Sequence, residues 1–265
     1  MIYAGIDAGS RSIKAVLYDP DRGEMPACGV ADQGVAQERL AAELFEKLLR
    51  EAGLERSQIS GVVATGYGRH AIKFADTTIT EITCHARGVH QLLPEARTLI
   101  EIGGQDSKVI CLEHGGRVRD FAMNDRCAAG TGRFLEMVAT RLDMDWEKLS
   151  ELACQSQHPA LISNMCVVFA ETEIIGLLAE GKSLPDVVAG VQNSIATRVA
   201  ALAGRMLLPP VCFTGGVALQ AGMARALAEA LGCPVRVAPQ PQYTGALGAA
   251  LLAGPARAAS VPKTG

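Results

Sequence analysis

Two cysteines lie where a thiolate could serve as a metal ligand. Cys127 precedes AAGTGRFLEMVATRL and Cys166 precedes VVFAETEIIGLLAEG, and both of these segments are predicted to be helical. Unpaired backbone N–H groups and the positive end of a helix dipole favour thiolates at such positions. An iron–sulfur cluster usually takes four thiolates, so two per chain would suffice if two chains share one cluster across a two-fold axis. The alternative is a pair of structural thiols.

Two glycine-rich turns contain the groups of a phosphate and Mg²⁺ site. DAGSRSIK occupies residues 7–14, and IGGQDSK occupies residues 102–108. Each provides a carboxylate (Asp7 or Asp106), a glycine for close approach of the backbone, and hydroxyl and amide donors. One such turn alone is equally well explained by an ordinary glycine hairpin. The repetition of the layout favours nucleotide binding.

Strands and helices in a repeated order are expected to position these turns. IYAGIDAG and SIKAVLYD are predicted to form a hairpin around residues 8–11, and a second unit of strand, turn and strand starts near residue 101. Helical spacing of apolar residues predicts one helix over residues 37–53 and another over about 186–206. The repeated unit predicts two duplicated lobes that face a cleft.

The composition is typical of a glycine-rich α/β protein. The 265 residues allow one large or two modest domains, and they include 28 glycines and only 4% aromatic residues. The net charge of -3 gives no reason to expect nucleic acid or an anionic membrane as a partner. Met1 leads directly into a strand-like segment, and no apolar stretch approaches the ~20 residues of a membrane span. We therefore expect a cytoplasmic protein whose eight cysteines are reduced, most of them as small core residues.

The order of these motifs resembles that of sugar kinases, actin and heat-shock-protein ATPases, whose two phosphate loops and adenosine loop match residues 7–14, 102–108 and 213–217. Within this superfamily the chain is most similar to the activator ATPases (component A) of 2-hydroxyacyl-CoA dehydratases and to the ATPase subunits of benzoyl-CoA reductases. One departure is Cys84, which stands where a small residue such as alanine is expected. The segments that carry the closer resemblance are TGYGR at 65–69, TEITCHARG at 80–88, IGGQDSK, NDRCAAGTGRFLE and SNMCVVFAETEII.

This resemblance implies an α/β fold with two actin-like (ribonuclease H-like) lobes around a nucleotide cleft. Residues 1–95 would form lobe I, and a C-terminal helix over residues 242–256 would pack back on it. Residues 96–241 would form lobe II, which carries both cluster cysteines. The last residues, 257–265, are expected to be a disordered tail.

The resemblance also implies a homodimer with one 4Fe-4S cluster, ligated by Cys127 and Cys166 from each chain, together with ATP or ADP and Mg²⁺. The predicted function is an ATP-hydrolysing iron–sulfur activator, which passes a low-potential electron from ferredoxin or flavodoxin to an iron–sulfur dehydratase or reductase. In this superfamily the segment AAGTG after Cys127 lies close to the nucleotide, so nucleotide state would move a cluster ligand and alter the docking surface. The acceptor stays open among a 2-hydroxyacyl-CoA dehydratase, an aryl-CoA reductase and an uncharacterised double-cluster reductase.

Residue roles follow from the matched loops. We expect Asp7 and Asp106 to orient Mg²⁺ through water, and Gln105 to position the attacking water, as glutamine does in GTPases. Lys14 would bring positive charge to the phosphates, or would alternatively cap a strand. The remaining predicted nucleotide contacts are hydroxyl and backbone groups of the glycine-rich turns: Gly9, Ser10, Ser12, Gly103, Gly104, Ser107, Gly130, Gly132, Gly215 and Gly216. For the last two glycines, predicted to approach the adenosine, the alternative is an ordinary turn at a strand end.

Two other functions remain open. A small-molecule kinase of the same fold, acting on a sugar or a carboxylic acid, would need a carboxylate base for its acceptor and would have no use for the paired cysteines. A non-enzymatic assembly protein would use nucleotide only as a conformational switch. Glu81 and His85 lie four residues apart and would share a helix face, as a proton relay or as a structural contact. The structural contact is the preferred interpretation for His85.

Overall fold

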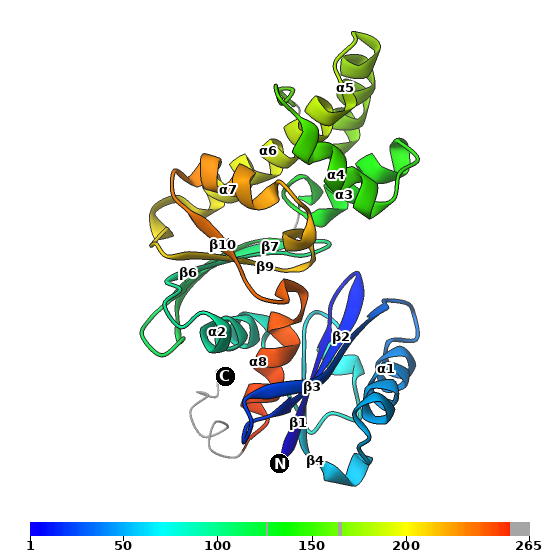
Figure 1. Cartoon of the computed structure of the whole chain (residues 1–265), viewed down its shortest axis with the longest axis vertical. Helices are drawn as coiled ribbons and strands as arrows, with labels where there is room; N and C mark the ends of the chain where they lie inside the picture. Colours follow the sequence, from blue (N-terminus) through cyan, green and yellow to red (C-terminus); the bar gives the residue numbers. More distant parts are fainter. Residues whose placement is uncertain (126, 164–165, 255–265) are drawn as a thin grey trace. The chain divides into compact units, whose positions relative to one another are not determined.

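The computed structural model describes residues 1–125, 127–163 and 166–254, so the tail expected at 257–265 lies outside the described residues. The described chain forms two compact units. Each unit contains one five-stranded sheet with helices packed against it (Figure 1). The first unit comprises Met1–Pro94, Glu113–Val118 and the described residues from Gln242 on, and the second comprises Glu95–Leu112 and Arg119–Pro241.

The sheet of the first unit has the order β3-β2-β1-β4-β5. β1 and β2 pair antiparallel, whereas β1 and β4 pair parallel. The pairing of Ala8 with Ile13 confirms the hairpin predicted around residues 8–11. The strands of this sheet are β1 (Ile2–Ala8), β2 (Ser12–Asp19), β3 (Glu24–Asp32), β4 (Ile59–Thr65) and β5 (Thr77–Thr78).

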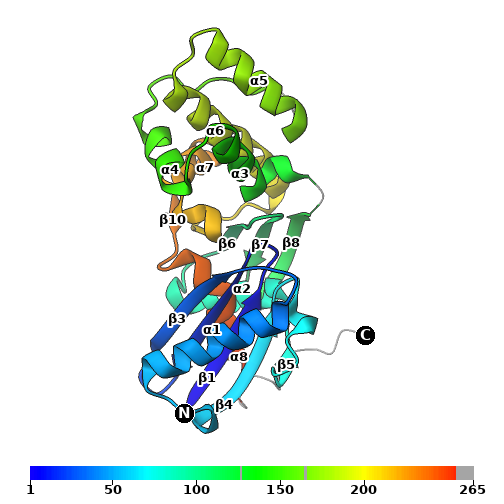
Figure 2. The same ribbon diagram turned by 90° about the vertical axis from the view of Figure 1, so that its right-hand side faces the viewer.

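Helices cover both faces of this sheet. Successive side chains of a strand point to opposite faces, so the two faces of β2 have different partners. Leu17 belongs to the core beneath α1 (Gln37–Ala52), whereas Val16 packs with α8 (Thr244–Leu252). Figure 2 shows α1 lying across the sheet. The remaining helix, α2 (Glu81–Leu92), packs against α8.

Glycines bring α8 into direct backbone contact with its neighbours. All nine residues of α8 are buried. A Cβ on Gly248 of this helix would overlap the carbonyl oxygen of Cys84 in α2, and a Cβ on Gly5 of β1 would overlap that of Ala246 in α8. The predicted C-terminal helix over 242–256 is observed over Thr244–Leu252, and glycines allow it to pack closely against β1 and α2.

The sheet of the second unit has the order β10-β9-β6-β7-β8. β6 pairs antiparallel with β7 and parallel with β9, as β1 does with β2 and β4. The first strand of each unit is thus central and is flanked by the second and fourth strands, which confirms the predicted repeat. The strands are β6 (Thr98–Ile102), β7 (Ser107–Leu112), β8 (Val118–Asn124), β9 (Val211–Thr214) and β10 (Val235–Val237).

The described part of the second unit contains five α-helices, which pack on its hydrophobic core. Val191 and Ile195 of α6 are fully buried in that core, which confirms the predicted apolar face. α6 begins earlier than the periodicity indicated because the Ser183 hydroxyl accepts a hydrogen bond from the backbone N–H of Asp186 at its first turn. The helices are α3 (Gly132–Arg141), α4 (Trp146–Gln155), α5 (Val167–Ala179), α6 (Leu184–Ala203) and α7 (Met223–Leu231).

Short 3₁₀ turns link several of these elements. They are Arg56–Gln58, Arg69–Ala71, Ala128–Gly130, Gly204–Met206, Gly216–Leu219 and Pro241–Tyr243. Among the described residues, no helix combines the length and the apolar character needed to span a membrane.

Candidate functional site

The first glycine turn holds its predicted carboxylate at the end of β1. Asp7 is 6% exposed and lies opposite Lys14 in the antiparallel register. The Lys14 ammonium group donates to the Ser12 carbonyl at 3.4 Å, and a Cβ on Gly9 would lie 3.3 Å from its Nζ. A glycine at position 9 therefore leaves room for the ammonium group inside the turn.

A neighbouring loop closes the space around Asp7. Gly66 has a φ of +87°, and a Cβ there would overlap both Asp7 Oδ1 and the Ala8 carbonyl. The Gly68 N–H donates to the Ala8 carbonyl at 2.8 Å. The TGYGR segment, for which no role was predicted, thus supports the Asp7 carboxylate.

The second glycine turn aligns with the first when the strand registers are compared. Glu101 pairs with Lys108 across β6 and β7, as Asp7 pairs with Lys14 across β1 and β2. Four residues separate the innermost pairs in both turns. By register, Glu101 rather than Asp106 therefore occupies the position equivalent to Asp7. The sequence comparison had matched the two turns through Asp106.

A buried lysine joins the two carboxylates of the second turn. Lys108 Nζ lies 2.8 Å from Glu101 Oε2 and 2.8 Å from Asp106 Oδ2. The Lys108 and Glu101 side chains are 2% and 6% exposed, whereas that of Asp106 is 25% exposed. Sequence reasoning missed Glu101 and Lys108, although charged residues within the apolar strands TLIEI and SKVICL were a signal.

The predicted adenosine loop meets this network within the second unit. Gly215 has a φ of +91°, and a Cβ there would overlap the Ile102 carbonyl and lie 2.7 Å from Glu101 Oε1. A Cβ on Gly103 would lie 3.2 Å from the same oxygen. The glycines of the two loops therefore make room for one carboxylate between them. Apart from its chain neighbours, nothing in the described part of the chain lies within 4 Å of a Cβ position at Gly216, so this position faces open space.

The second turn is also hydrogen-bonded to the start of α3. The N–H of Gly132 donates to the Gly103 carbonyl at 2.9 Å, and the N–H of Arg133 donates to the Gly104 carbonyl at 2.8 Å. The Thr131 hydroxyl lies 2.9 Å from the Ala128 carbonyl and 3.2 Å from the Gly104 carbonyl, and it accepts from the Arg133 N–H as the N-cap of α3. Phosphate loop and helix start therefore form one connected piece of backbone.

Both predicted cluster cysteines are exposed and precede a helical segment. Cys166 is the N-cap residue of α5, and its side chain makes no capping hydrogen bond to the described part of that helix. Cys127 precedes the 3₁₀ turn Ala128–Gly130, and α3 begins only at Gly132. The prediction of a helix directly after Cys127 was therefore wrong by one short turn, because Thr131 provides the capping hydroxyl.

Local hydrogen bonds hold the backbone near each cysteine. The Cys127 N–H donates to Asn124 Oδ1 at 3.1 Å, and Asn124 Nδ2 donates to the Cys127 carbonyl at 2.9 Å. Ser163 donates to Glu173 Oε1 on α5 through its N–H at 2.8 Å and its hydroxyl at 2.6 Å. The Cys166 carbonyl accepts from the Ala170 N–H at 2.9 Å, so hydrogen bonds hold the backbone of both exposed cysteines.

The other cysteines differ in accessibility. Burial raises the pKa of Cys84 and that of Cys212 to about 12, so these thiols stay protonated at ordinary pH. Cys154, at the end of α4, is exposed in the same way as Cys127 and Cys166. The departure at position 84 thus places a core thiol in α2. Among the residues that the structure describes, no group of three or more His, Cys, Asp or Glu side chains could hold a metal ion within one chain.

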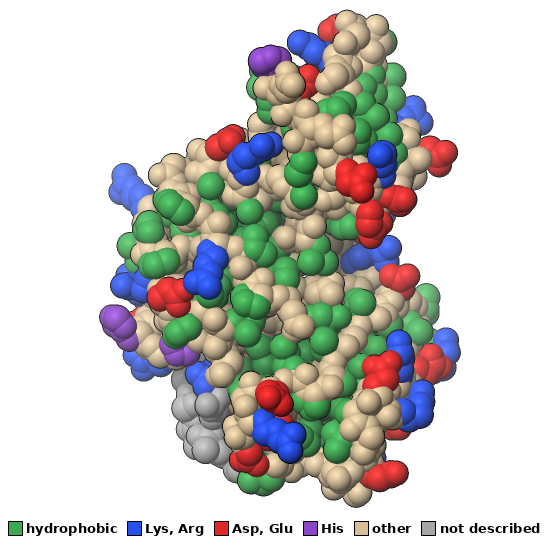
Figure 3. Space-filling view, viewed as in Figure 1, with side chains coloured by type: hydrophobic (Ala, Val, Ile, Leu, Met, Phe, Trp, Pro, Cys, Tyr) green, Lys and Arg blue, Asp and Glu red, His purple; other side chains and the backbone are tan. Residues whose placement is uncertain are grey.

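Apolar side chains flank Cys166. Val168 is 70% exposed, Phe169 is 65% exposed and Leu161 is 82% exposed. Figure 3 shows hydrophobic side chains gathered over α5. An apolar surface beside an exposed thiol is typical of a region that another protein surface covers.

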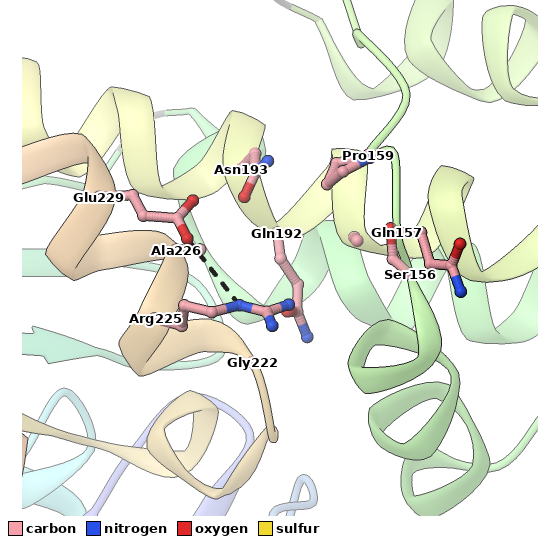
Figure 4. Close-up of a pocket in the computed structure, with 10 residues that line it drawn as sticks. Ser156, Gln157, Pro159, Gln192, Asn193, Gly222, Arg225, Ala226 and Glu229 are labelled. Carbon is pink, nitrogen blue, oxygen red and sulfur yellow. Dashed lines mark ion pairs between the residues drawn. The ribbon is translucent and has the colours of Figure 1, made fainter.

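A pocket of about 200 Å³ lies elsewhere in the second unit (Figure 4). It is formed by α6, α7 and the segment after α4, and the Arg225–Glu229 pair of α7 lies along its wall. None of the predicted site residues lines it. Asp7, Gly9, Ser10, Ser12 and Lys14 belong to the first unit, and the other predicted site residues belong to the second.

Two sheets of the same strand order, each with a glycine turn after its central strand, are characteristic of the actin-like ATPase fold. A family model matches residues 4–253, and the chain belongs to the BadF/BadG/BcrA/BcrD ATPase family. It is 47% identical to the activator of lactoyl-CoA dehydratase from Anaerotignum propionicum, over 96% of this chain and 97% of that protein. It is 43% identical to the 2-hydroxyisocaproyl-CoA dehydratase activator of Clostridioides difficile, over 96% and 95% of the two chains.

The fold agrees with that of a solved relative. The activator of the 2-hydroxyisocaproyl-CoA dehydratase from Clostridium difficile, solved with bound ADPNP, superposes with a TM-score of 0.92 at 41% identity, and the match covers 100% of both chains. The expected α/β ATPase fold is therefore confirmed, as is the resemblance to activator ATPases.

Proposed function

We propose that this chain is an ATP-hydrolysing iron–sulfur activator, which delivers a low-potential electron to a 2-hydroxyacyl-CoA dehydratase or a related double-cluster reductase. The observation that carries the proposal is the hydrogen-bonded connection between the Gly103–Gly104 loop and the start of α3, with Cys127 just upstream. The similarity to activators of lactoyl-CoA and 2-hydroxyisocaproyl-CoA dehydratases supports the same assignment.

The donor set fits a cluster that two copies of the chain share. Cys127 and Cys166 are exposed thiols at the starts of helical segments, where N–H groups favour an anionic ligand. Two such thiols per chain give the four ligands of one 4Fe-4S cluster in a homodimer. The exposed Val168 and Phe169 beside Cys166 would be covered by the second copy. The bound cluster would supply the store for a single electron.

The glycine turns are proposed to hold ATP or ADP with Mg²⁺. Asp7 and Asp106 would orient the ion through water, and Lys14 would face the phosphates. Gln105 is exposed at the tip of its turn, which supports its proposed role of positioning the attacking water. The backbone and hydroxyl groups of the same turns, with those of Gly130 and Gly132, would contact the nucleotide: Gly9, Ser10, Ser12, Gly103, Gly104, Ser107, Gly215 and Gly216.

Nucleotide state would act on the cysteines through the backbone. A shift of Gly103 and Gly104 on phosphate binding would pull on the N–H groups of Gly132 and Arg133, and thereby on the turn that follows Cys127. If the free energy of cluster reduction differs by ~1.4 kcal/mol between two nucleotide states, the one-electron reduction potential differs by ~59 mV. A difference of several kcal/mol would therefore shift the potential of the cluster by a few hundred millivolts. Reduced ferredoxin or flavodoxin is the proposed electron donor.

The test is the iron and acid-labile sulfide content of protein purified without oxygen, together with the mass of the assembly. We expect roughly two irons per chain in a dimer. Cys127→Ser and Cys166→Ser should each abolish the iron and leave nucleotide binding intact. Cys154→Ser is the matched control, because this thiol is also exposed, and it should retain full iron content.

Three results would contradict the assignment. Iron that persists in both single variants would exclude these cysteines as ligands. Loss of iron in Cys154→Ser would point to a different ligand set. A wild-type protein without iron under strictly anaerobic conditions would reject the activator, and ATP-dependent phosphorylation of sugars or carboxylic acids would then be assayed.

A further inference from the structure

The side-chain amide of Asn124 contacts both backbone groups of Cys127. Asn124 is the last residue of β8, and its Oδ1 accepts from the Cys127 N–H at 3.1 Å. Its Nδ2 donates to the Cys127 carbonyl at 2.9 Å. Because the N–H needs an acceptor and the carbonyl needs a donor, the two contacts together define the orientation of the amide. One side chain thus holds the backbone of a predicted cluster ligand at two points.

The turn that follows Cys127 leaves room for this amide. A Cβ on Gly130 would lie only 2.9 Å from Asn124 Nδ2, and 3.8 Å from Ser107 Oγ. The Gly130 N–H also donates to the Cys127 carbonyl, with 3.5 Å between nitrogen and oxygen. Glycine at position 130 therefore allows the amide to reach Cys127, and a side chain at this position would displace the amide.

The strand that carries the amide lies next to the second glycine turn. β8 lies beside β7 in the sheet (Figure 2), and β7 starts at Ser107, within the turn sequence IGGQDSK. Ser107 is buried, whereas Cys127 is exposed. The backbone of an exposed cysteine is thus held by a side chain of the sheet itself.

The two contacts at Cys127 require more than a cap of one N–H group. Aspartate accepts a hydrogen bond from a backbone N–H as well as asparagine does, and either residue suits a local turn. An ionised carboxylate only accepts, so aspartate at position 124 could not donate to the Cys127 carbonyl. The pair of contacts therefore needs an amide, whereas a simple turn would not.

We propose that Asn124 is a positioning residue for the iron–sulfur cluster, whose amide holds the backbone of Cys127 and thereby sets the place of this thiolate. The inference rests on the function proposed above, in which Cys127 is a cluster ligand. Partners that hydrogen-bond to a metal ligand orient it, and their loss typically lowers metal affinity by about 10- to 100-fold. In this role Asn124 acts through Cys127 and need not touch the cluster.

The first measurement is the rate at which a chelator removes iron from anaerobically purified, nucleotide-free protein. Asn124→Ala removes both contacts, and we expect iron to leave about 10- to 100-fold faster than from wild type. Asn124→Asp keeps the acceptor and loses the donor, so iron should also leave faster. Gly130→Ala keeps the asparagine but displaces its amide, and should likewise release iron faster.

Asp145→Ala is the matched control for these variants. Asp145 Oδ1 accepts from the backbone N–H of Lys148, three residues further along the chain, at 2.7 Å. The contact has the same spacing as that between Asn124 and the Cys127 N–H, and it lies in the same unit at an exposed position. No predicted cluster ligand depends on it, so iron should leave Asp145→Ala within about twofold of the wild-type rate.

Amide hydrogen exchange measures the contact without the cluster. In cluster-free protein, the Cys127 N–H should exchange about 2- to 10-fold faster in Asn124→Ala than in wild type, because one hydrogen bond is lost. Asn124→Asp should retain the wild-type protection, since its carboxylate still accepts from this N–H. The amides of α6, followed by NMR in the same samples, should exchange at unchanged rates and so report that the unit stays folded.

Four results would overturn the inference. One is iron release from Asn124→Ala at the wild-type rate, which would also assign any effect of Asn124→Asp to its added charge. Another is wild-type release from Asn124→Asp beside fast release from Asn124→Ala, because a cap of the N–H would then suffice. The third is equally fast release from Asp145→Ala. The last is a Cys127 N–H that exchanges at the same rate in wild type and Asn124→Ala.

The outcomes also separate this inference from the proposed function. A wild-type protein without iron would reject the proposed function, and the role of Asn124 with it. Iron that is lost in Cys127→Ser but held normally in Asn124→Ala would leave the proposed function standing and reject the role of Asn124 alone.

Discussion

Replacing Lys108 with methionine would leave two carboxylates without their shared cation. Lys108 Nζ lies 2.8 Å from both Glu101 Oε2 and Asp106 Oδ2, and the lysine side chain is 2% exposed. Methionine retains most of the aliphatic volume, so the change removes charge and hydrogen bonds rather than packing. Breaking a buried ion pair by removing one partner costs about 3–5 kcal/mol. Because the Asp106 side chain is 25% exposed and water can reach it, we expect a loss of about 3 kcal/mol in the free energy of unfolding.

The assay is urea unfolding of the nucleotide-free protein, followed by circular dichroism. Arg236→Met is the matched control, because Arg236 Nη1 also lies 2.8 Å from a carboxylate, that of Glu95, but both side chains are largely exposed. An exposed pair contributes about 0–1 kcal/mol, so the control should unfold almost as wild type does. Adding Glu101→Gln to Lys108→Met should restore part of the loss, since the double variant no longer buries an unpaired carboxylate at position 101.

Two outcomes would contradict the expected destabilisation by Lys108→Met. A loss in Lys108→Met no larger than that in Arg236→Met would refute it, because the lysine charge would then be solvated in the folded protein. A double variant less stable than Lys108→Met would likewise refute it. In either case the ion pairs of Lys108 with Glu101 and Asp106 would not be a major source of stability.

Two further predictions concern thiols and acid stability. At mildly alkaline pH, an alkylating reagent should modify cluster-free protein at Cys127, Cys154 and Cys166. Cys84 should not react, because burial raises its pKa to about 12. In the iron-loaded protein, Cys127 and Cys166 should be protected and Cys154 should stay reactive, as peptide mass spectrometry would show. Hydrogen bonds from two serine hydroxyls and two backbone N–H groups lower the pKa of Asp186, so its contribution to stability is present above its unfolded pKa and is lost as pH falls below that value. Asp186→Asn should therefore unfold in less urea than wild type at neutral pH and approach it in acid, whereas a constant difference between the two would contradict this.

The fold was largely predictable because its signals are local. Alternation of apolar residues predicted the hairpin of β1 and β2, and helical spacing predicted α1 and α6. The repetition of a glycine turn after a strand predicted two duplicated lobes. Each of these features depends on residues within a few positions of one another, so the pattern can be read without knowledge of the partners.

The site was only partly predictable because strand register decides which residues face each other. Glu101 and Lys108 are neighbours across two strands, whereas the layout of the two turns in the sequence matched Asp106 to Asp7. The approach of α2 to α8 depends on Gly88 and Gly248, which lie in different parts of the chain. No local pattern relates such residues, so the backbone contact between these two helices emerged only from the structure.

The interaction energies between α3 and α5 indicate how a shift of the Gly103–Gly104 loop would reach both cysteines. Arg141 of α3 pairs with Glu171 of α5 at 3.1 Å, but this partly exposed ion pair contributes at most about 1 kcal/mol. It could therefore not couple the two helices by several kcal/mol. The free energy from apolar burial is larger, because Ala170 and Ile174 of α5 lie in the same core as Phe134 of α3. Fully burying one large apolar side chain contributes about 1.5–3 kcal/mol. Packing rather than the ion pair therefore couples α5 to α3, so a shift that enters α3 at its bonds to the glycine turn would reach the helix that follows Cys166.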